Sequence, residues 1–336
     1  MYFKVLEEMK GVEKEYKAIL RISRHGYWED IEREKPYNVD TFNRMLKELN
    51  NMEIEMPING IETNVKLVIE TNERESPLLI MTMKVNREKY IYKDEKKFEK
   101  MGEDKEFLEL VHIENVVEDF KKQIQNFKMA VNISYPGLLE VYGVEIYING
   151  IKEFNSNNVL SSLLISVNEA KRDNWPKMEI IDIKRTWNWL KKRKSFINGM
   201  SSNAIERALC ALSYIYDCYS YEDLFYAMIG IEAIYARNKE GILQQIKEKS
   251  RAIFGEPSDY MKRLKHMYNV RSRFIHGELN FPPRYCMDGD TKEFIEFADK
   301  QYFDSKNFAQ AILISSIQQF VIRDTDEIEF ELKVKN

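Results

Sequence analysis

The sequence predicts an α+β protein, with a β-rich mixed domain over residues 1–180 and an all-α bundle over residues 184–325. Apolar residues alternate in short runs through the first part, which is the period of a half-buried strand. In the second part they recur at the spacing of an amphipathic helix. A polar stretch, Asn168 to Pro176, ends in proline and favours a boundary zone between the two.

The N-terminal domain is expected to hold several strands and two helices. Alternating or densely apolar runs predict strands over 52–58, 65–70, 78–85, 138–147 and 151–154. The last two are joined by Asn149-Gly150, which favours a tight turn. Helical spacing predicts helices over 40–49 and 114–127. These elements favour a sandwich or a curved sheet flanked by helices.

The C-terminal domain is expected to begin after an extended piece at 178–183 and to continue as four to five helices with short connections. Capping residues and stop signals place the helices at 203–216, 222–236, 240–254, 260–275 and 305–321. The expected caps are Ser202 or Asn203, Ser220 and Ser258. Gly255 and Gly277 are the expected terminators.

Composition excludes several classes of protein. The three cysteines are at no metal-ligand spacing and fit a reducing, cytoplasmic setting. We expect neither a signal peptide nor a membrane span, because no apolar run approaches the ~20 residues that a span needs. The sequence has no phosphate-binding glycine loop, no paired Cys/His spacing and no serine-hydrolase elbow, so no cofactor and no metal are expected. The net charge of −4 leaves nucleic-acid binding to local clusters of charge.

Arg271 and His276 form the pattern with the most chemical content. Arginine can hold a phosphate by two-point contact, and histidine has the pKa suited to proton transfer near neutrality. The chain has four histidines, and only His276 has an arginine five to seven positions upstream. Positions five apart lie about 140° apart on an ideal helix, so convergence requires the helix to end near His276. The alternative is that Arg271 pairs with an acid and His276 caps its helix.

Glu232 lies on an otherwise apolar helix face, where an acid is costly to bury unless it is paired. It orients Arg271 or His276, or it forms an internal salt bridge with a base such as Arg207, and the two interpretations are not exclusive.

Two basic stretches are candidate RNA contacts. The first, with Lys191 and Arg193, flanks Trp187 and Trp189, and basic plus aromatic residues suit single-stranded RNA. The second lies on the helix that carries Arg271, and its candidates are Lys262, Arg263, Lys265, Ser272 and Arg273. The alternative for both stretches is a solvated helix face, which is the usual explanation of a basic run. The segment Ser23 to Glu29 is interpreted as either a ligand loop or a turn, and His112 as structural.

The chain from Trp187 to about Phe320 resembles the Apea-like HEPN family. The resemblance rests on Trp187-Asn188-Trp189-Leu190, on Ser201 to Ala208, on the apolar helix with its central Glu232, on the helix over 242–254, and on Arg271 to His276 with the trailing Gly277. HEPN nucleases often carry Asn, Asp or His after the arginine, where this chain has Ser272.

The resemblance implies a homodimeric, metal-independent endoribonuclease of the antiphage-defence or toxin type, active in abortive infection. Arg271 would hold the phosphate, His276 would be the base and Glu232 would orient them. A phage-derived or protein trigger would act on the N-terminal domain. The alternative is a non-catalytic HEPN module that dimerises and binds nucleotide, RNA or protein.

Overall fold

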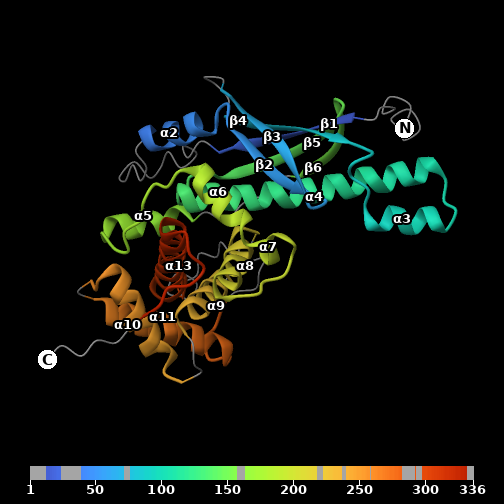
Figure 1. Cartoon of the computed structure of the whole chain (residues 1–336). Coiled ribbons are helices and arrows are strands. Elements are labelled where there is room, and N and C mark those ends of the chain that lie inside the picture. Colours follow the sequence, from blue (N-terminus) through green and yellow to red (C-terminus); the bar gives the residue numbers. More distant parts are fainter. Residues whose placement is uncertain are drawn as a thin grey trace. The chain divides into compact units, whose positions relative to one another are not determined.

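The computed structural model describes residues 13–23, 39–71, 76–156, 163–217, 222–236, 240–257, 259–281, 292 and 297–330. The chain divides into two compact units. The N-terminal unit comprises Met1–Met129 and Leu139–Val159, and the C-terminal unit comprises Ala130–Leu138 and Leu160–Asn336. The division therefore falls earlier than residue 180, and a short piece from the N-terminal half belongs to the C-terminal unit. The α+β class is confirmed (Figure 1).

The N-terminal unit is built on one antiparallel sheet with strand order β2-β3-β4-β1-β5-β6. Its strands are β1 (Glu13–Ile22), β2 (Glu53–Ile58), β3 (Ile61–Glu70), β4 (Leu78–Asn86), β5 (Val141–Ile148) and β6 (Ile151–Ser156). Asn149 and Gly150 both have positive φ, as the expected tight turn between β5 and β6 requires. β1 was not predicted, although it lies between β4 and β5 at the centre of the sheet.

In the described part of this unit, the helices that accompany the sheet are α2 (Val39–Leu49), α3 (Lys93–Lys100) and α4 (Lys105–Ser134). α4 lies along one face of the sheet (Figure 1) and buries Val116, Phe120 and Ile124. It is far longer than the helix expected over 114–127, and its last five residues belong to the C-terminal unit. α3 was not predicted.

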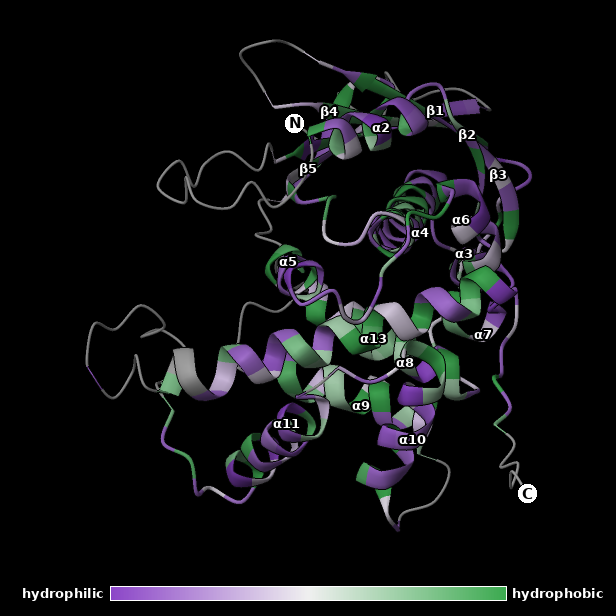
Figure 2. Ribbon diagram, turned by 90° about the vertical axis from the view of Figure 1, so that its left-hand side faces the viewer, coloured by the Kyte–Doolittle hydropathy of each residue, from purple (hydrophilic) through white to green (hydrophobic). Residues whose placement is uncertain are grey.

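The C-terminal unit is helical. Its elements are α5 (Leu164–Arg172), α6 (Ile183–Lys191), α7 (Lys194–Ile197), α8 (Ala204–Asp217), α9 (Asp223–Tyr235), α10 (Ile242–Phe254), α11 (Tyr260–Ile275), the π-helix η1 (Ala298–Phe303) and α13 (Asp304–Arg323). α13 is buried along most of its length and contacts α5, α8, α9 and α11. Figure 2 shows α9, α11 and α13 side by side. Residues 177–182 form no regular element, so the expected extended piece is not a strand.

The helix boundaries follow the expected signals where these are described. The side chain of Asn203 accepts a hydrogen bond from the backbone N–H of Glu206 at 2.9 Å and so caps α8. Gly255 and Gly277 have positive φ at the ends of α10 and α11. Ser220 and Ser258 lie outside the described residues. None of the described helices combines the length and the apolar character that crossing a membrane requires.

Candidate functional site

Helix α11 carries the arginine–histidine motif and ends directly after it. The backbone N–H of His276 donates to the carbonyl of Ser272 at 3.0 Å, so helical hydrogen bonding continues up to His276. Gly277, with φ of +70°, then turns the chain away. Because the helix is regular through the motif, the side chains of Arg271 and His276 leave it about 140° apart. Within one chain they therefore face different directions.

Arg271 faces α9 and forms a cluster with Glu232 and Tyr268. Its Nη2 lies 3.7 Å from Glu232 Oε1, and the hydroxyl of Tyr268 donates to the same oxygen at 3.2 Å. Burial, and then the charge of Glu232, raise the pKa of Tyr268, so this hydroxyl stays a donor. The contact supports the interpretation that Glu232 orients Arg271. At 3.7 Å the pair is loose, and the guanidinium is one-third exposed.

His276 and Ser272 are exposed at the end of the same helix. An exposed histidine can exchange protons with a ligand, and an exposed hydroxyl can donate to a phosphate oxygen. The structure therefore leaves both groups accessible, whereas Arg271 is half-buried beside them.

Several of the basic residues expected to contact RNA are accessible to solvent. Lys262 and Lys265 on α11 are exposed, and Arg273 is half-exposed with its Nη1 3.2 Å from Gln301 Oε1. Lys191 is also partly exposed.

The prediction that Arg193 contacts RNA is wrong, because its guanidinium is buried. The guanidinium lies 3.8 Å over the Trp189 ring, donates to the carbonyl of Thr325 at 3.0 Å and pairs with Asp326. Trp187 and Trp189 are buried as well. Arg193 and Trp189 hold the end of α6 against the segment after α13. Because all three side chains are buried, neither Arg193 nor the two indoles can contact RNA.

Beside the motif lies an exposed surface of α9, here called the α9 face and made of Phe225, Tyr226, Ile229 and Glu232. Half of the Ile229 side chain is exposed. Two aromatic contacts extend the face: Tyr214 of α8 stacks on Tyr226 at 4.7 Å, and Phe274 of α11 packs on Phe225 at 4.8 Å. The opposite side of α9 is buried against α13. Together with the α9 face, this makes the helix apolar around most of its circumference, which is typical of a helix that is covered on both sides.

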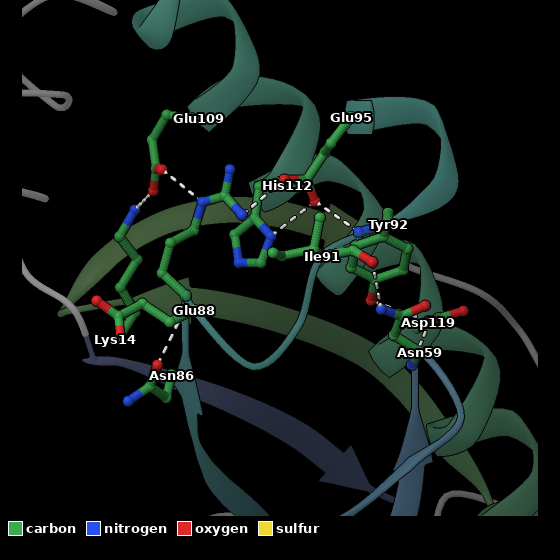
Figure 3. A network of polar contacts seen from close by, with 11 residues as sticks. Lys14, Asn59, Asn86, Glu88, Ile91, Tyr92, Glu95, Glu109, His112 and Asp119 are labelled. Carbon is green, nitrogen blue, oxygen red and sulfur yellow. Dashed lines mark hydrogen bonds and ion pairs between the residues drawn. The ribbon is translucent and has the colours of Figure 1, made fainter. Parts of the chain in front are cut away.

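The N-terminal unit contains a separate polar network, which Figure 3 shows. Lys14 pairs with Glu109, Arg87 bridges Glu109 at 3.0 Å and Glu95 at 2.6 Å, and His112 Nδ1 lies 3.0 Å from Glu95 Oε1. The network ties β1, the chain after β4, α3 and α4 together. His112 is buried, and burial lowers its pKa, so it is neutral at pH 7 and has the structural role expected of it.

Sequence reasoning missed this network because its members lie far apart in the chain. The one local signal is Lys14 at a position of β1 that alternation assigns to the buried face. No cluster of three or more His, Cys, Asp or Glu among the described residues could hold a metal ion. Of the segment 23–29, only Ser23 is described.

Comparison with protein-family models found no match, and no significant match was found among curated proteins or solved structures. The resemblance to the Apea-like HEPN family therefore stays a prediction carried by the residues quoted for it.

Proposed function

We propose that the protein is a metal-independent endoribonuclease that acts as a homodimer through its C-terminal unit. The observation that carries this proposal is the placement of an ion-paired arginine, an exposed histidine and an exposed apolar helix face at one end of α11. Arginine and histidine suffice for phosphodiester cleavage with a ribose 2′-hydroxyl as nucleophile.

In the proposed reaction, His276 takes the proton from the 2′-hydroxyl. The 2′-oxygen then bonds to the adjacent phosphorus while the bond from phosphorus to the 5′-oxygen breaks. The products are a 2′,3′-cyclic phosphate and a 5′-hydroxyl, so the leaving 5′-oxygen must gain a proton. Arg271 stabilises the charge that builds on the phosphate. Glu232 holds Arg271, and Tyr268 in turn donates a hydrogen bond to Glu232.

A second copy of the chain would supply what one chain lacks. The two motif side chains diverge within one protomer, and a single histidine cannot be both base and acid in one step. An isologous interface brings the same residues of two copies together. The α9 face, apolar beside the motif, is where we place that interface, and covering it would remove the exposed Ile229 from water.

The test is incubation of the purified protein with mixed cellular RNA in EDTA, beside a His276→Ala variant. We expect RNA with cyclic-phosphate ends from the wild type, and a loss of about 10²- to 10⁴-fold in the variant because a general acid–base group is removed. Equal cleavage by both proteins would reject the assignment of His276. Growth arrest on expression of the wild type, and not of the variant, would support the proposed role in antiphage defence in the cytoplasm.

A second candidate function is a non-catalytic module that binds RNA, nucleotide or a partner protein. It is favoured by the contact between Arg271 and Glu232 and by Ser272 at the position after the arginine. Under this function the wild type would dimerise and bind RNA, and the RNA would stay intact in the same assay.

A further inference from the structure

A hollow of about 690 Å³ opens in the C-terminal unit at the start of α11. Its walls include the end of α5, Trp175 and the first turns of α11. Sites for small ligands span roughly 300–1,000 Å³, so this hollow can hold a nucleotide. It has no part in the chemistry proposed for Arg271 and His276.

The inner wall of the hollow is fixed by Arg263. Its Nη1 donates to Asp173 at 2.7 Å, its Nη2 lies 3.5 Å from Asp304, and its guanidinium lies 4.4 Å from the centre of the Phe308 ring. The side chain is only 14% exposed. Arg263 therefore lines the hollow and neutralises two carboxylates, so its charge is not available to bind a ligand.

Lys262 and His266 form the outer rim, one helical turn apart on α11. Lys262 is exposed and His266 is half-exposed. Asp259, at the start of the helix, is the remaining carboxylate of the wall. Because cations and carboxylates nearly balance, the hollow suits a ligand with both an anionic group and hydrogen-bond donors, as a nucleotide has.

The rim continues as a polar stripe along α11 toward His276. Lys262, His266, Asn269, Arg273 and His276 fall within about 80° of one another on the helix, because they follow a spacing of four, three, four and three residues. All five are exposed or half-exposed. At about 1.5 Å per residue, the stripe is roughly 21 Å long.

We propose that this stripe and the hollow, together called the α11 track, hold the single strand of RNA on one side of the cleaved bond. A phosphate lies at Lys262 and His266, and Asp259 accepts a hydrogen bond from a base amino group or a ribose hydroxyl. With a rise of about 3.4 Å per stacked nucleotide, the track accommodates roughly six nucleotides. The choice of RNA as ligand rests on the proposed function.

The experiment measures binding of fluorescent 2′-O-methyl RNA, which lacks the nucleophilic hydroxyl and cannot be cleaved. A decamer and a tetramer are compared on the wild type, on a Lys262→Gln/His266→Gln variant and on a Lys247→Gln control, whose lysine lies on α10. We expect the double variant to raise the Kd for the decamer roughly tenfold and to lower its salt slope by about one. The tetramer, too short to span the track, and the control should change little.

An unchanged Kd for the decamer in the double variant, or an equal effect on the tetramer, would overturn the track. Cleavage assays separate this failure from that of the proposed function. If the track alone is wrong, wild-type cleavage persists and the double variant keeps the wild-type KM for a cleavable decamer. If the wild type neither cleaves nor binds RNA, both proposals fail.

Discussion

Arg271 lies between an acid that holds it and a solvent-exposed side from which a phosphate could approach. Arg271→Lys keeps the positive charge but loses the planar fork that grips two phosphate oxygens. We expect the variant to lose most of the roughly 10²- to 10³-fold in kcat that a single donor to a developing oxyanion supplies. The measurement is single-turnover cleavage, with folding checked by circular dichroism. Near-full activity would mean that Arg271 acts only as a general positive charge.

His112 predicts how the stability of the N-terminal unit depends on pH. Burial lowers its pKa, and the charge of Arg87 acts in the same direction, while the hydrogen bond and charge of Glu95 partly oppose them. The unfolded chain, with a histidine pKa of about 6.5, therefore binds a proton before the folded chain does as the pH falls. The free energy of unfolding should therefore decrease as the pH is lowered from 7.5 to 5.

The matched variant is His112→Gln, whose amide can still donate to Glu95 but does not titrate. Urea unfolding at the two pH values should show a smaller decrease for the variant than for the wild type. Glu109 does not obscure this comparison: burial tends to raise its pKa, but the bonds to Lys14 and Arg87 outweigh burial and lower it, so its effect lies at more acidic pH. An identical pH dependence in both proteins would contradict the role given to His112.

Among single residues, the sequence identified those of the motif and one of their partners but not the other. It named Glu232 as a candidate orienting residue, and the structure brings Glu232 to Arg271. It could not identify Tyr268 as the third member, because a tyrosine at helical spacing is ordinarily a packing residue. Arg193 shows the opposite error: a basic residue near tryptophans resembles an RNA contact, although the indole it covers is buried.

Among the elements, those with clear caps and terminators were predicted closely. The bounds of α11 match the expected helix over 260–275, and β4 and α2 differ from expectation by one residue. β1 was missed because Ala18 weakens its apolar alternation and Lys14 occupies a buried position. The full length of α4 was missed because its first turns carry many charges. These cases show that long-range partners, here Glu109 for Lys14, override the local pattern.

The close packing of α9 on α13 predicts the effect of a substitution at their contact. A Cβ added at Gly230 would lie 2.6 Å from one terminal methyl of Leu313 and 3.0 Å from the other. Both contacts are with terminal atoms of Leu313, whose side chain is buried, so this side chain must shift within the core. Gly230→Ala should lower the free energy of unfolding by about 1–3 kcal/mol, despite the gain in helix propensity.

Chemical denaturation measures this effect, and Leu313→Ala supplies the control. Combined with Leu313→Ala, which vacates the space, Gly230→Ala should destabilise less than it does alone. Strictly additive effects of the two substitutions would show that α9 and α13 are not in the close contact described.

For the whole molecule, the main prediction is that cleavage belongs to the dimer. Ile229→Asp places a charge in the centre of the α9 face and should shift the protein to monomers and abolish cleavage. Light scattering after gel filtration reports the mass, and Tyr214→Asp is a second substitution on the same surface. A monomer that cleaves RNA at the full rate would contradict the prediction.

Mixing chains tests the shared site directly. Arg271→Ala and His276→Ala homodimers should be inactive. A heterodimer of the two keeps one Arg271 and one His276 but lacks the second histidine, so mixing should restore only a small part of the activity, with water donating the proton to the leaving 5′-oxygen. Mixing Ile229→Asp versions of the same chains serves as the control, because these chains should not associate.

The path of α4 through both units limits how this protein can be divided or recombined. The last turn of α4 belongs to the C-terminal unit, where the hydroxyl of Ser134 donates to Thr186 at 2.7 Å and the carbonyl of Ile133 accepts from Gln318 at 2.7 Å. A fragment that begins at residue 160 would therefore lack part of its own core. We expect such a fragment to be insoluble, or to fold only when a peptide covering 130–138 is added, as thermal unfolding with and without the peptide would show. In evolutionary terms, the two halves are not interchangeable modules, and a gene fusion that exchanged one of them would have to carry this helix with it.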